Sequence, residues 1–198
     1  MKSIVAPLVA LAASFALAVH GCGGDPGPTT GSGTVTGTVN GSAFTVRDAI
    51  TGAYTLFGQP VTLIALTDFA GACGIAKTNA NVKNSGLVGF FLWNNDGNGH
   101  LTPVTTPGTY TLDDPNDSNF PTTGRVGIGT VVKNDATCQD TSVSFKSGTV
   151  TVTTVDSFGG FTGTFDGTTT ANIHLTGTFT TTACTFPAPS DGGTSACN

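Results

Sequence analysis

The sequence predicts an all-β fold: a single antiparallel β-sandwich, or a strongly coiled and partly closed barrel, of about 8–10 strands. Three observations predict it. The 198-residue chain contains 37 Thr and no Glu, and Thr favours strands whereas Glu favours helices. Apolar and hydroxyl-bearing side chains alternate along several segments with the period of two of a half-buried strand. Turn signals separate these segments at intervals of roughly 8–12 residues, which is typical of sandwiches and barrels.

The first residues predict an export signal. Lys2 is followed by an almost unbroken apolar run over residues 4–19, the layout of a secretory signal, and this run is short for a membrane span. Two cleavage sites compete. Residues 16–18, ALA, fit the rule of ordinary signal peptidase. Residues 19–22, VHGC, resemble the lipobox of bacterial lipoproteins, although His20 stands where a small residue is usual.

The five cysteines favour the lipoprotein interpretation. Diacylation of Cys22 leaves an even set for disulfides in an oxidising compartment, whereas ordinary cleavage leaves one unpaired thiol. We therefore expect a signal peptide over residues 1–21 and a lipid anchor at Cys22. The anchor would hold the protein on the exported side of a membrane in the bacterial cell envelope, periplasmic or surface-exposed. The alternative is a secreted protein whose Cys22 is free or cross-linked.

A flexible tether is predicted after the anchor. Residues 22–33 consist mainly of Gly, Pro, Ser and Thr and show no periodicity. The remaining residues, 34–198, have the length of a single domain. The formal net charge of the chain is −5, and Lys and Arg form no cluster. Nucleic acid is therefore not an expected partner, and the expected membrane contact is the acylated Cys22.

The strands follow from alternation. In residues 148–155 Val alternates with Thr, and in residues 161–165, FTGTF, the Phe and Gly positions share one face while both Thr face water. The mid-strand Gly lets a strand bend, or lets a neighbouring ring cover the gap. Residues 173–179 repeat this pattern after an Asp-Gly turn, so we expect these two strands to pair antiparallel. The other candidate strands are residues 33–39, 42–47, 53–57, 61–67, 87–93, 108–112 and 125–133.

One short helical segment is expected near residues 68–80, with Asp68 as its N-cap. The strand at 87–93, LVGFFLW, is apolar on both faces. It should therefore be central in the sheet or covered by another element, and the segment 68–80 is the candidate cover.

Several of these motifs together resemble a known group of proteins. The stretches GTVTGTVNGSAFTVRDA, DFAGAC, SGTVTVTTV, FTGTFDG and LTGTFTTTAC are similar to uncharacterised Gly/Thr-rich bacterial lipoproteins of the myxobacterial type, which carry a type II signal peptide. The likeness covers most of the chain after the signal. It implies a shared β fold and a surface or periplasmic location, and it implies no activity.

Four cysteines are expected to form two disulfide bonds. Three connectivities are possible, and we favour Cys184–Cys197, which closes the C-terminal tail, and Cys73–Cys138, which ties the helical segment to a loop.

A calcium loop is the one metal candidate. Asn94, Asp96 and Asn98 have the oxygen side chains and spacing of the first half of such a loop, but Thr105 stands where a bidentate acid is required. The alternative, which we favour, is a tight Asn/Asp/Gly turn. The segment 113–119, DDPNDSN, offers the same two interpretations. We expect no cofactor and no metal.

The remaining candidates do not predict catalysis. His100 and His174 are the only histidines after the signal, too few for a zinc site, and Trp93 is best explained as a core residue. We expect a non-enzymatic protein with a structural or partner-binding role. One alternative is a small-ligand or glycan-binding barrel with a cavity between Phe161, Phe165 and Phe179. The second is an Asp-based hydrolase.

Overall fold

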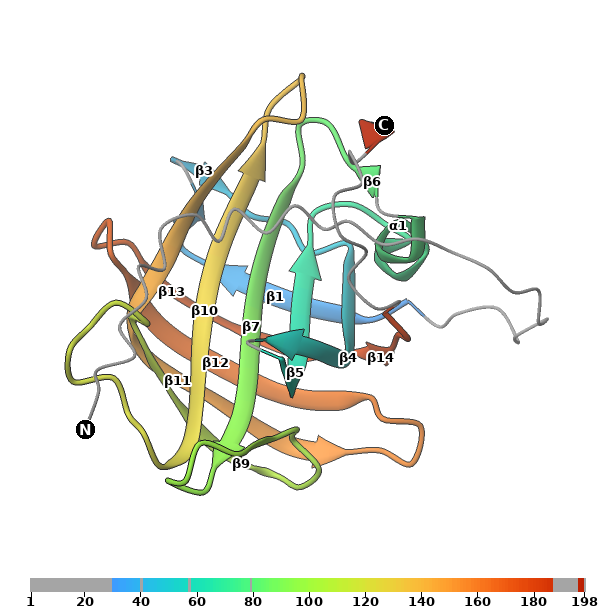
Figure 1. Cartoon of the computed structure of the whole chain (residues 1–198). Helices are drawn as coiled ribbons and strands as arrows, with labels where there is room; N and C mark the ends of the chain where they lie inside the picture. The colour runs from blue at the N-terminus through green and yellow to red at the C-terminus, as the bar shows by residue number, and fades with distance from the viewer. Residues whose placement is uncertain (1–29, 40, 57, 79, 187–195, 198) are drawn as a thin grey trace.

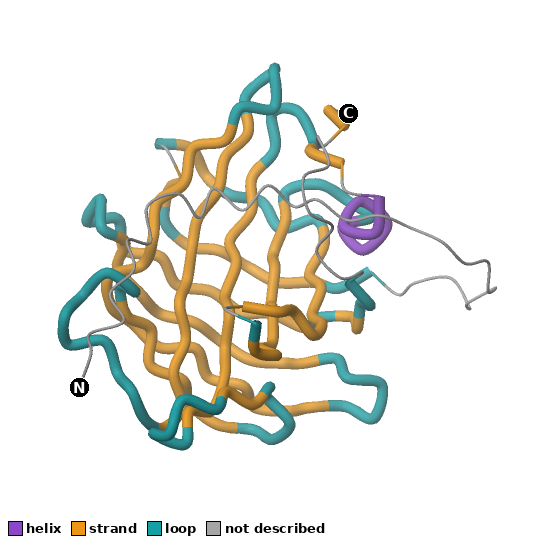
Figure 2. The backbone as a smooth tube through the Cα atoms, viewed as in Figure 1, coloured by secondary structure: helices purple, strands orange, loops and turns teal. Residues whose placement is uncertain are grey.

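The computed structural model describes residues 30–39, 41–56, 58–78, 80–186 and 196–197, and in this part of the chain it confirms an all-β fold with one short helix (Figures 1 and 2). The predicted signal peptide, Cys22 and most of the tether lie outside these residues. The strands are β1 (Ser32–Thr36), β2 (Thr38–Val39), β3 (Ser42–Ala43), β4 (Asp48–Leu56), β5 (Gln59–Thr67), β6 (Ala80–Asn81), β7 (Gly86–Asn95), β8 (Leu101–Thr102), β9 (Gly108–Asp113), β10 (Gly124–Asn134), β11 (Asp140–Val155), β12 (Phe161–Thr169), β13 (His174–Thr180), β14 (Thr182–Ala183) and β15 (Ala196–Cys197), and the helix is α1 (Ala72–Thr78).

Eleven strands form one sheet in the order β1-β13-β12-β11-β9-β10-β7-β5-β4-β14, with β8 beside β7. Most neighbours are antiparallel, including the predicted pair β12–β13, but β9–β10 and β14–β4 are parallel. The first parallel pair has a simple cause. The 16-residue strand β11 pairs antiparallel with β10 along its first half and with β9 along its second half, so β9 and β10 run in the same direction.

The sheet curls into a half-barrel. In Figure 1 the strands β11, β12, β13 and β1 cross behind β10, β7 and β5. The chain spans the open side where β13 continues through the buried Thr181 into β14, which pairs with β4. Thr181 fixes this corner, because its hydroxyl accepts the N–H of Phe161 at 2.8 Å and its own N–H donates to the Phe161 carbonyl at 2.7 Å.

Glycines opposite aromatic rings shape the interior. Gly163 lies opposite Phe179 in the register of β12 and β13, and Gly177 lies opposite Phe165. A Cβ atom on Gly163 would lie 2.5 Å from the Phe179 ring, and a Cβ atom on Gly177 would lie 2.5 Å from the Phe165 ring. The glycine of each Thr-Gly-Thr motif therefore leaves room for a Phe ring directly above the backbone of the neighbouring strand. This explains why the motif occurs in both β12 and β13.

The interior core is filled with side chains from every part of the sheet. Phe161, Phe165 and Phe179 are buried there, and the Phe90 ring packs 5.0 Å from the Phe165 ring between centroids. A second core lies on the outer face of β4, β5, β7 and β10, so β7 is buried on both faces as its sequence predicts. Side chains of helix α1 and of the segment after β14, such as Ala76 and Phe186, pack against this second core.

Helix α1 forms where a helix is expected, but Asp68 does not cap it. The chain turns at Gly71, which has φ +74°, and the helix begins at Ala72. The Asp68 carboxylate instead accepts the N–H of Gly86 at 2.7 Å. The acceptor for the first N–H of the helix is the carboxylate of Asp48, on β4, at 2.9 Å from the Ala72 nitrogen.

Asp48 is the most connected buried acid of the described residues. Its side chain is 3% exposed. Besides Ala72, it accepts the N–H of Ala49 at 2.8 Å and the N–H of Gly31, just before β1, at 3.1 Å. One carboxylate therefore joins β4, the start of α1 and the chain that enters β1. Strand β1 is the edge strand at the opposite end of the sheet order from β4 and β14.

Both disulfides form, but the predicted pairing is wrong. The bonds are Cys73–Cys184 and Cys138–Cys197, with Cα atoms 5.6 and 5.9 Å apart. Strand β14 carries Cys184 along β4 toward α1, where the Cys184 N–H donates to the Thr51 carbonyl at 2.6 Å. Strand β15 runs beside β6, which holds Cys197 near Cys138. Two disulfide bonds indicate an oxidising, non-cytoplasmic location.

The disulfide pairing gives a first prediction. Digestion of the unreduced protein should release the peptide pairs that contain Cys73 with Cys184 and Cys138 with Cys197, as read by mass spectrometry. Replacing both Cys73 and Cys184 with Ser should lower the free energy of unfolding by about 2–5 kcal/mol, because the bridge closes a long loop. Peptides that join Cys184 to Cys197 would contradict the register of β14 on β4.

Candidate functional site

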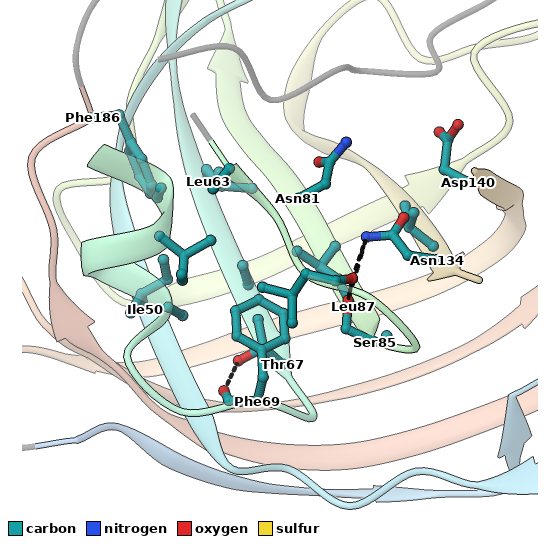
Figure 3. Close-up of a pocket in the computed structure, with 18 residues that line it drawn as sticks. Ile50, Leu63, Thr67, Phe69, Asn81, Ser85, Leu87, Asn134, Asp140 and Phe186 are labelled. Carbon is teal, nitrogen blue, oxygen red and sulfur yellow. Dashed lines mark hydrogen bonds between the residues drawn. The ribbon is translucent and has the colours of Figure 1, made fainter. Parts of the chain in front are cut away.

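The candidate site is a pocket between α1 and the outer face of the sheet (Figure 3). Its cavity volume is about 100 Å³. Strands β4, β5 and β7 form its floor, α1 forms one wall, and residues 80–86 with the end of β10 form the opposite wall. We call it the α1 pocket.

The floor and the walls of the α1 pocket are mainly apolar. Leu63 and Leu87 line the floor, Ile75 lines the wall that α1 forms, and the rings of Phe69 and Phe186 lie at its sides. These side chains come from segments far apart in the sequence, and they meet because β4, β5 and β7 are neighbours in the sheet and because α1 packs beside β4. The pocket is therefore suited to an apolar body.

A few polar groups converge on one side of the pocket. Asn134, at the end of β10, donates from Nδ2 to the Val82 carbonyl at 3.1 Å and to the Ser85 hydroxyl at 3.3 Å. The Ser85 hydroxyl in turn donates to the Val82 carbonyl at 2.6 Å. Asn81 and the exposed Asp140 lie on the same side in Figure 3. Amide oxygens and a carboxylate at the mouth can orient the polar end of a ligand.

One disulfide bond and one hydrogen bond hold the α1 wall of the pocket in place. The Cys73–Cys184 disulfide ties α1 to the end of β14, and Asp48 binds the first N–H of α1 from β4. Helix α1 has only seven residues, so these connections rather than its own propensity keep it over the sheet.

The pocket is not at the place that the ligand-barrel alternative requires. That alternative needs a cavity between Phe161, Phe165 and Phe179, but these residues are 5%, 3% and 1% exposed and belong to the interior core. The sequence does contain a signal for the actual site, because the doubly apolar strand 87–93 predicts a cover. It does not indicate that the cover leaves a space.

The calcium candidate forms an Asn/Asp turn. The Asp96 carboxylate accepts the N–H groups of Asn98 at 2.7 Å and of His100 at 3.3 Å. The bond from the Asn98 N–H is the main cause that lowers the pKa of Asp96. Asn94 lies in the β7–β8 pair, where its Nδ2 donates to the Pro103 carbonyl at 3.4 Å. These hydrogen bonds therefore do not bring the side-chain oxygens of Asn94, Asp96 and Asn98 together around a single point.

The second acidic turn is built in the same way. Asp114 accepts the N–H of Asn116 at 2.9 Å, and Asp117 accepts the N–H of Asn119 at 2.8 Å. Within the residues that the structure describes, no group of three or more His, Cys, Asp or Glu side chains is placed to hold a metal ion.

The contacts of His174 and Trp93 are those of structural residues. His174 is exposed on β13, and its Nε2 lies 2.9 Å from the Asp166 carboxylate, which is also exposed. Trp93 is 4% exposed in the outer core and stacks on Phe120 with ring centroids 6.2 Å apart. His100 lies in the Asp96 turn and is exposed.

Tyr110 is a polar core residue that the sequence does not single out. Its side chain is fully buried in the interior core, and its hydroxyl makes no hydrogen bond to the described residues. Burial raises its pKa, although the Arg125 guanidinium, 5.8 Å above the ring, opposes this effect. The alternation of residues 108–112 predicts that the Tyr110 side chain points inward. It does not predict that the hydroxyl lacks a hydrogen-bond partner among the described residues.

Two further results concern relatives and membranes. No protein-family model, curated protein or solved structure matches the chain. In the described part of the chain, no helix is long and apolar enough to cross a membrane.

Proposed function

We propose that the protein is a lipid-anchored domain of the bacterial cell envelope with a non-enzymatic binding role, and that the α1 pocket receives the bound group. The observation that carries the binding role is this pocket, which has apolar walls and a few polar groups on one side. The proposed ligand is a small molecule, or part of a larger one, with an apolar body and one polar end.

The size of the pocket limits the ligand. A cavity of about 100 Å³ is smaller than the ~150 Å³ apolar cavity that is known to hold benzene. The buried part of the ligand is therefore no larger than a single ring or a short aliphatic chain. Its polar end would meet Asn81, Asn134 or Asp140 at the mouth.

The N-terminal sequence and the disulfides support the proposed location. Residues 4–19 have the layout of an export signal, and VHGC at 19–22 resembles a lipobox. The disulfides account for Cys73, Cys138, Cys184 and Cys197, which leaves Cys22 as the cysteine for acylation. A diacylated cysteine buries enough CH₂ groups, at ~0.8 kcal/mol each, to hold the protein on a membrane. The same features support membership of the Gly/Thr-rich lipoproteins.

The lipid anchor is tested with a Cys22→Ser variant expressed beside the wild type in cells fed a labelled fatty acid. The wild type should carry the label, appear in the membrane fraction and show the intact mass of a chain that begins at acylated Cys22. The variant should lose label and membrane association together, because no other thiol is free to be acylated. Label that persists in the variant would disprove the anchor.

The α1 pocket is tested by filling it. Ala76→Leu adds apolar volume on the pocket side of α1, and Lys77→Leu, its matched control, adds the same side chain at an exposed position. Binding of hexan-1-ol and benzyl alcohol is measured by saturation-transfer NMR. The wild type and Lys77→Leu should give signals, and Ala76→Leu should lose at least about four-fifths of them, as a loss of over 1 kcal/mol implies.

Two results would contradict the pocket as a binding site. One is the absence of any signal from either alcohol with the wild type. The other is equal signals from the wild type and from Ala76→Leu, if the variant unfolds at the same temperature as the wild type.

A further inference from the structure

Two polar side chains at the mouth of the α1 pocket form a cross-strand pair. Asn134 and Asp140 stand directly opposite each other in the antiparallel pair of β10 and β11. Residues in such positions have Cβ atoms about 4.5–5.5 Å apart and project from the same face of the sheet. Both residues line the pocket (Figure 3). The Asn134 amide and the Asp140 carboxylate therefore lie next to each other at the mouth.

Hydrogen bonds fix which end of the Asn134 amide is available to a ligand. Its Nδ2 donates to the Val82 carbonyl at 3.1 Å and to the Ser85 hydroxyl at 3.3 Å. A carbonyl can only accept, so the contact with Val82 identifies the nitrogen end, and both N–H groups of the amide are used. Within the described residues, Oδ1 of Asn134 accepts no hydrogen bond. This oxygen therefore remains as an acceptor.

The hydroxyl donors that line the pocket are also used within the protein. Ser85 donates to the Val82 carbonyl at 2.6 Å, and Thr67 donates to the Phe69 carbonyl at 2.7 Å. The half-buried Asn81 carries both an oxygen and an NH₂ group, so its amide fits either kind of polar group on a ligand. The polar side of the pocket therefore offers more acceptors than donors.

The charge around the pocket has one sign. In the described part of the chain, Asp140 is the one charged residue that lines the pocket, and the one ion pair, His174 with Asp166, does not involve it. Two further carboxylates, those of Asp48 and Asp68, accept backbone N–H groups of lining residues. Three lysines follow or precede lining residues in the chain but do not line the pocket themselves: Lys77, Lys83 and Lys133. The mouth therefore attracts a cation and repels an anion.

The mouth is held rigidly against the apolar walls. The Asp135 carboxylate accepts the N–H of Gln139 at 3.0 Å and closes the turn between β10 and β11. Cys138, in this turn, is disulfide-bonded to β15, which pairs with β6. The N–H of Asn134 donates to the Ser85 carbonyl at 2.8 Å. Acceptors that are already in position bind a ligand at a lower cost in conformational entropy than flexible ones.

We propose that the α1 pocket selects ligands whose polar end is a primary ammonium group, such as a short alkylamine or an arylmethylamine. This inference rests on the binding role proposed above. The ammonium group has three N–H donors, which match Oδ1 of Asn134 and the carboxylate of Asp140, whereas a hydroxyl supplies one donor and a carboxylate none. The apolar body enters first and the ammonium stays at the mouth. A Lys side chain, which carries its ammonium at the tip, presents these parts in the wrong order.

The test compares ligands that differ only in the polar end. One series is hexylamine, hexan-1-ol and hexanoate, and the other is benzylamine, benzyl alcohol and benzoate. Their Kd values for the full chain are measured by saturation-transfer NMR titration at pH 7 and low ionic strength, where both amines are protonated. Each amine should bind at least about threefold more tightly than its alcohol, and each carboxylate at least about threefold more weakly, as one exposed ion pair allows.

Three variants locate the preference. Asp140→Asn should reduce the advantage of each amine over its alcohol to less than about twofold. Asp140→Lys should reverse the order, so that each carboxylate binds more tightly than its amine. Asp166→Asn removes the same charge from an exposed position on β12 and should keep the order of the wild type. Each variant is compared at the unfolding temperature of the wild type, so that a loss of folding is not read as a loss of binding.

The outcomes separate this proposal from the binding role itself. Equal Kd values for the three polar ends, with all binding lost in Ala76→Leu, would overturn the ammonium preference and leave the pocket as a binding site. Tighter binding of the carboxylates to the wild type would overturn it as well. A preference for amines that persists in full in Ala76→Leu or in Asp140→Asn would place it on another acidic surface. If none of the six ligands binds, the ammonium preference and the binding role both fail.

Discussion

The buried carboxylate of Asp48 is the interaction on which the arrangement of the outer elements depends. It accepts backbone N–H groups from Gly31, Ala49 and Ala72, which belong to the chain before β1, to β4 and to α1. A seven-residue helix has little stability of its own, so its position over the outer core needs this acceptor and the Cys73–Cys184 bond. The α1 pocket exists because these two connections hold α1 beside β4, where its side chains face the pocket that β4, β5 and β7 also line.

The two halves of the sheet have different outer surfaces. The half formed by β4, β5, β7 and β10 is apolar on both sides and is covered, which produces the α1 pocket. The half formed by β9, β11, β12, β13 and β1 is apolar only inside, and its outer side carries exposed or half-buried Thr residues that lie opposite one another on neighbouring strands. One half of the sheet therefore has an apolar pocket beneath covering segments, and the other half has an open outer surface that carries hydroxyl groups.

The strands were predictable from sequence because alternation is local, and so was the cover over residues 87–93. The pairings that give the molecule its sites are not local. The acceptor for α1 lies 24 residues away in the chain, and the disulfide partners depend on the register of β14 against β4 and of β15 against β6. The alignment of Thr residues across β11 and β12 likewise depends on their register, which contains irregularities in β11 that neither strand reveals by itself.

The most direct test of this account is the free energy of unfolding in urea for Asp48→Ala and Asp48→Asn, with the exposed Asp140→Asn as control. Asp48→Ala leaves three buried N–H groups without an acceptor, so we expect a loss of at least about 3 kcal/mol. Asp48→Asn keeps one oxygen and should lose roughly half as much, and Asp140→Asn should change stability by less than about 0.5 kcal/mol. A loss of under about 1 kcal/mol for Asp48→Ala would contradict the central role of this carboxylate.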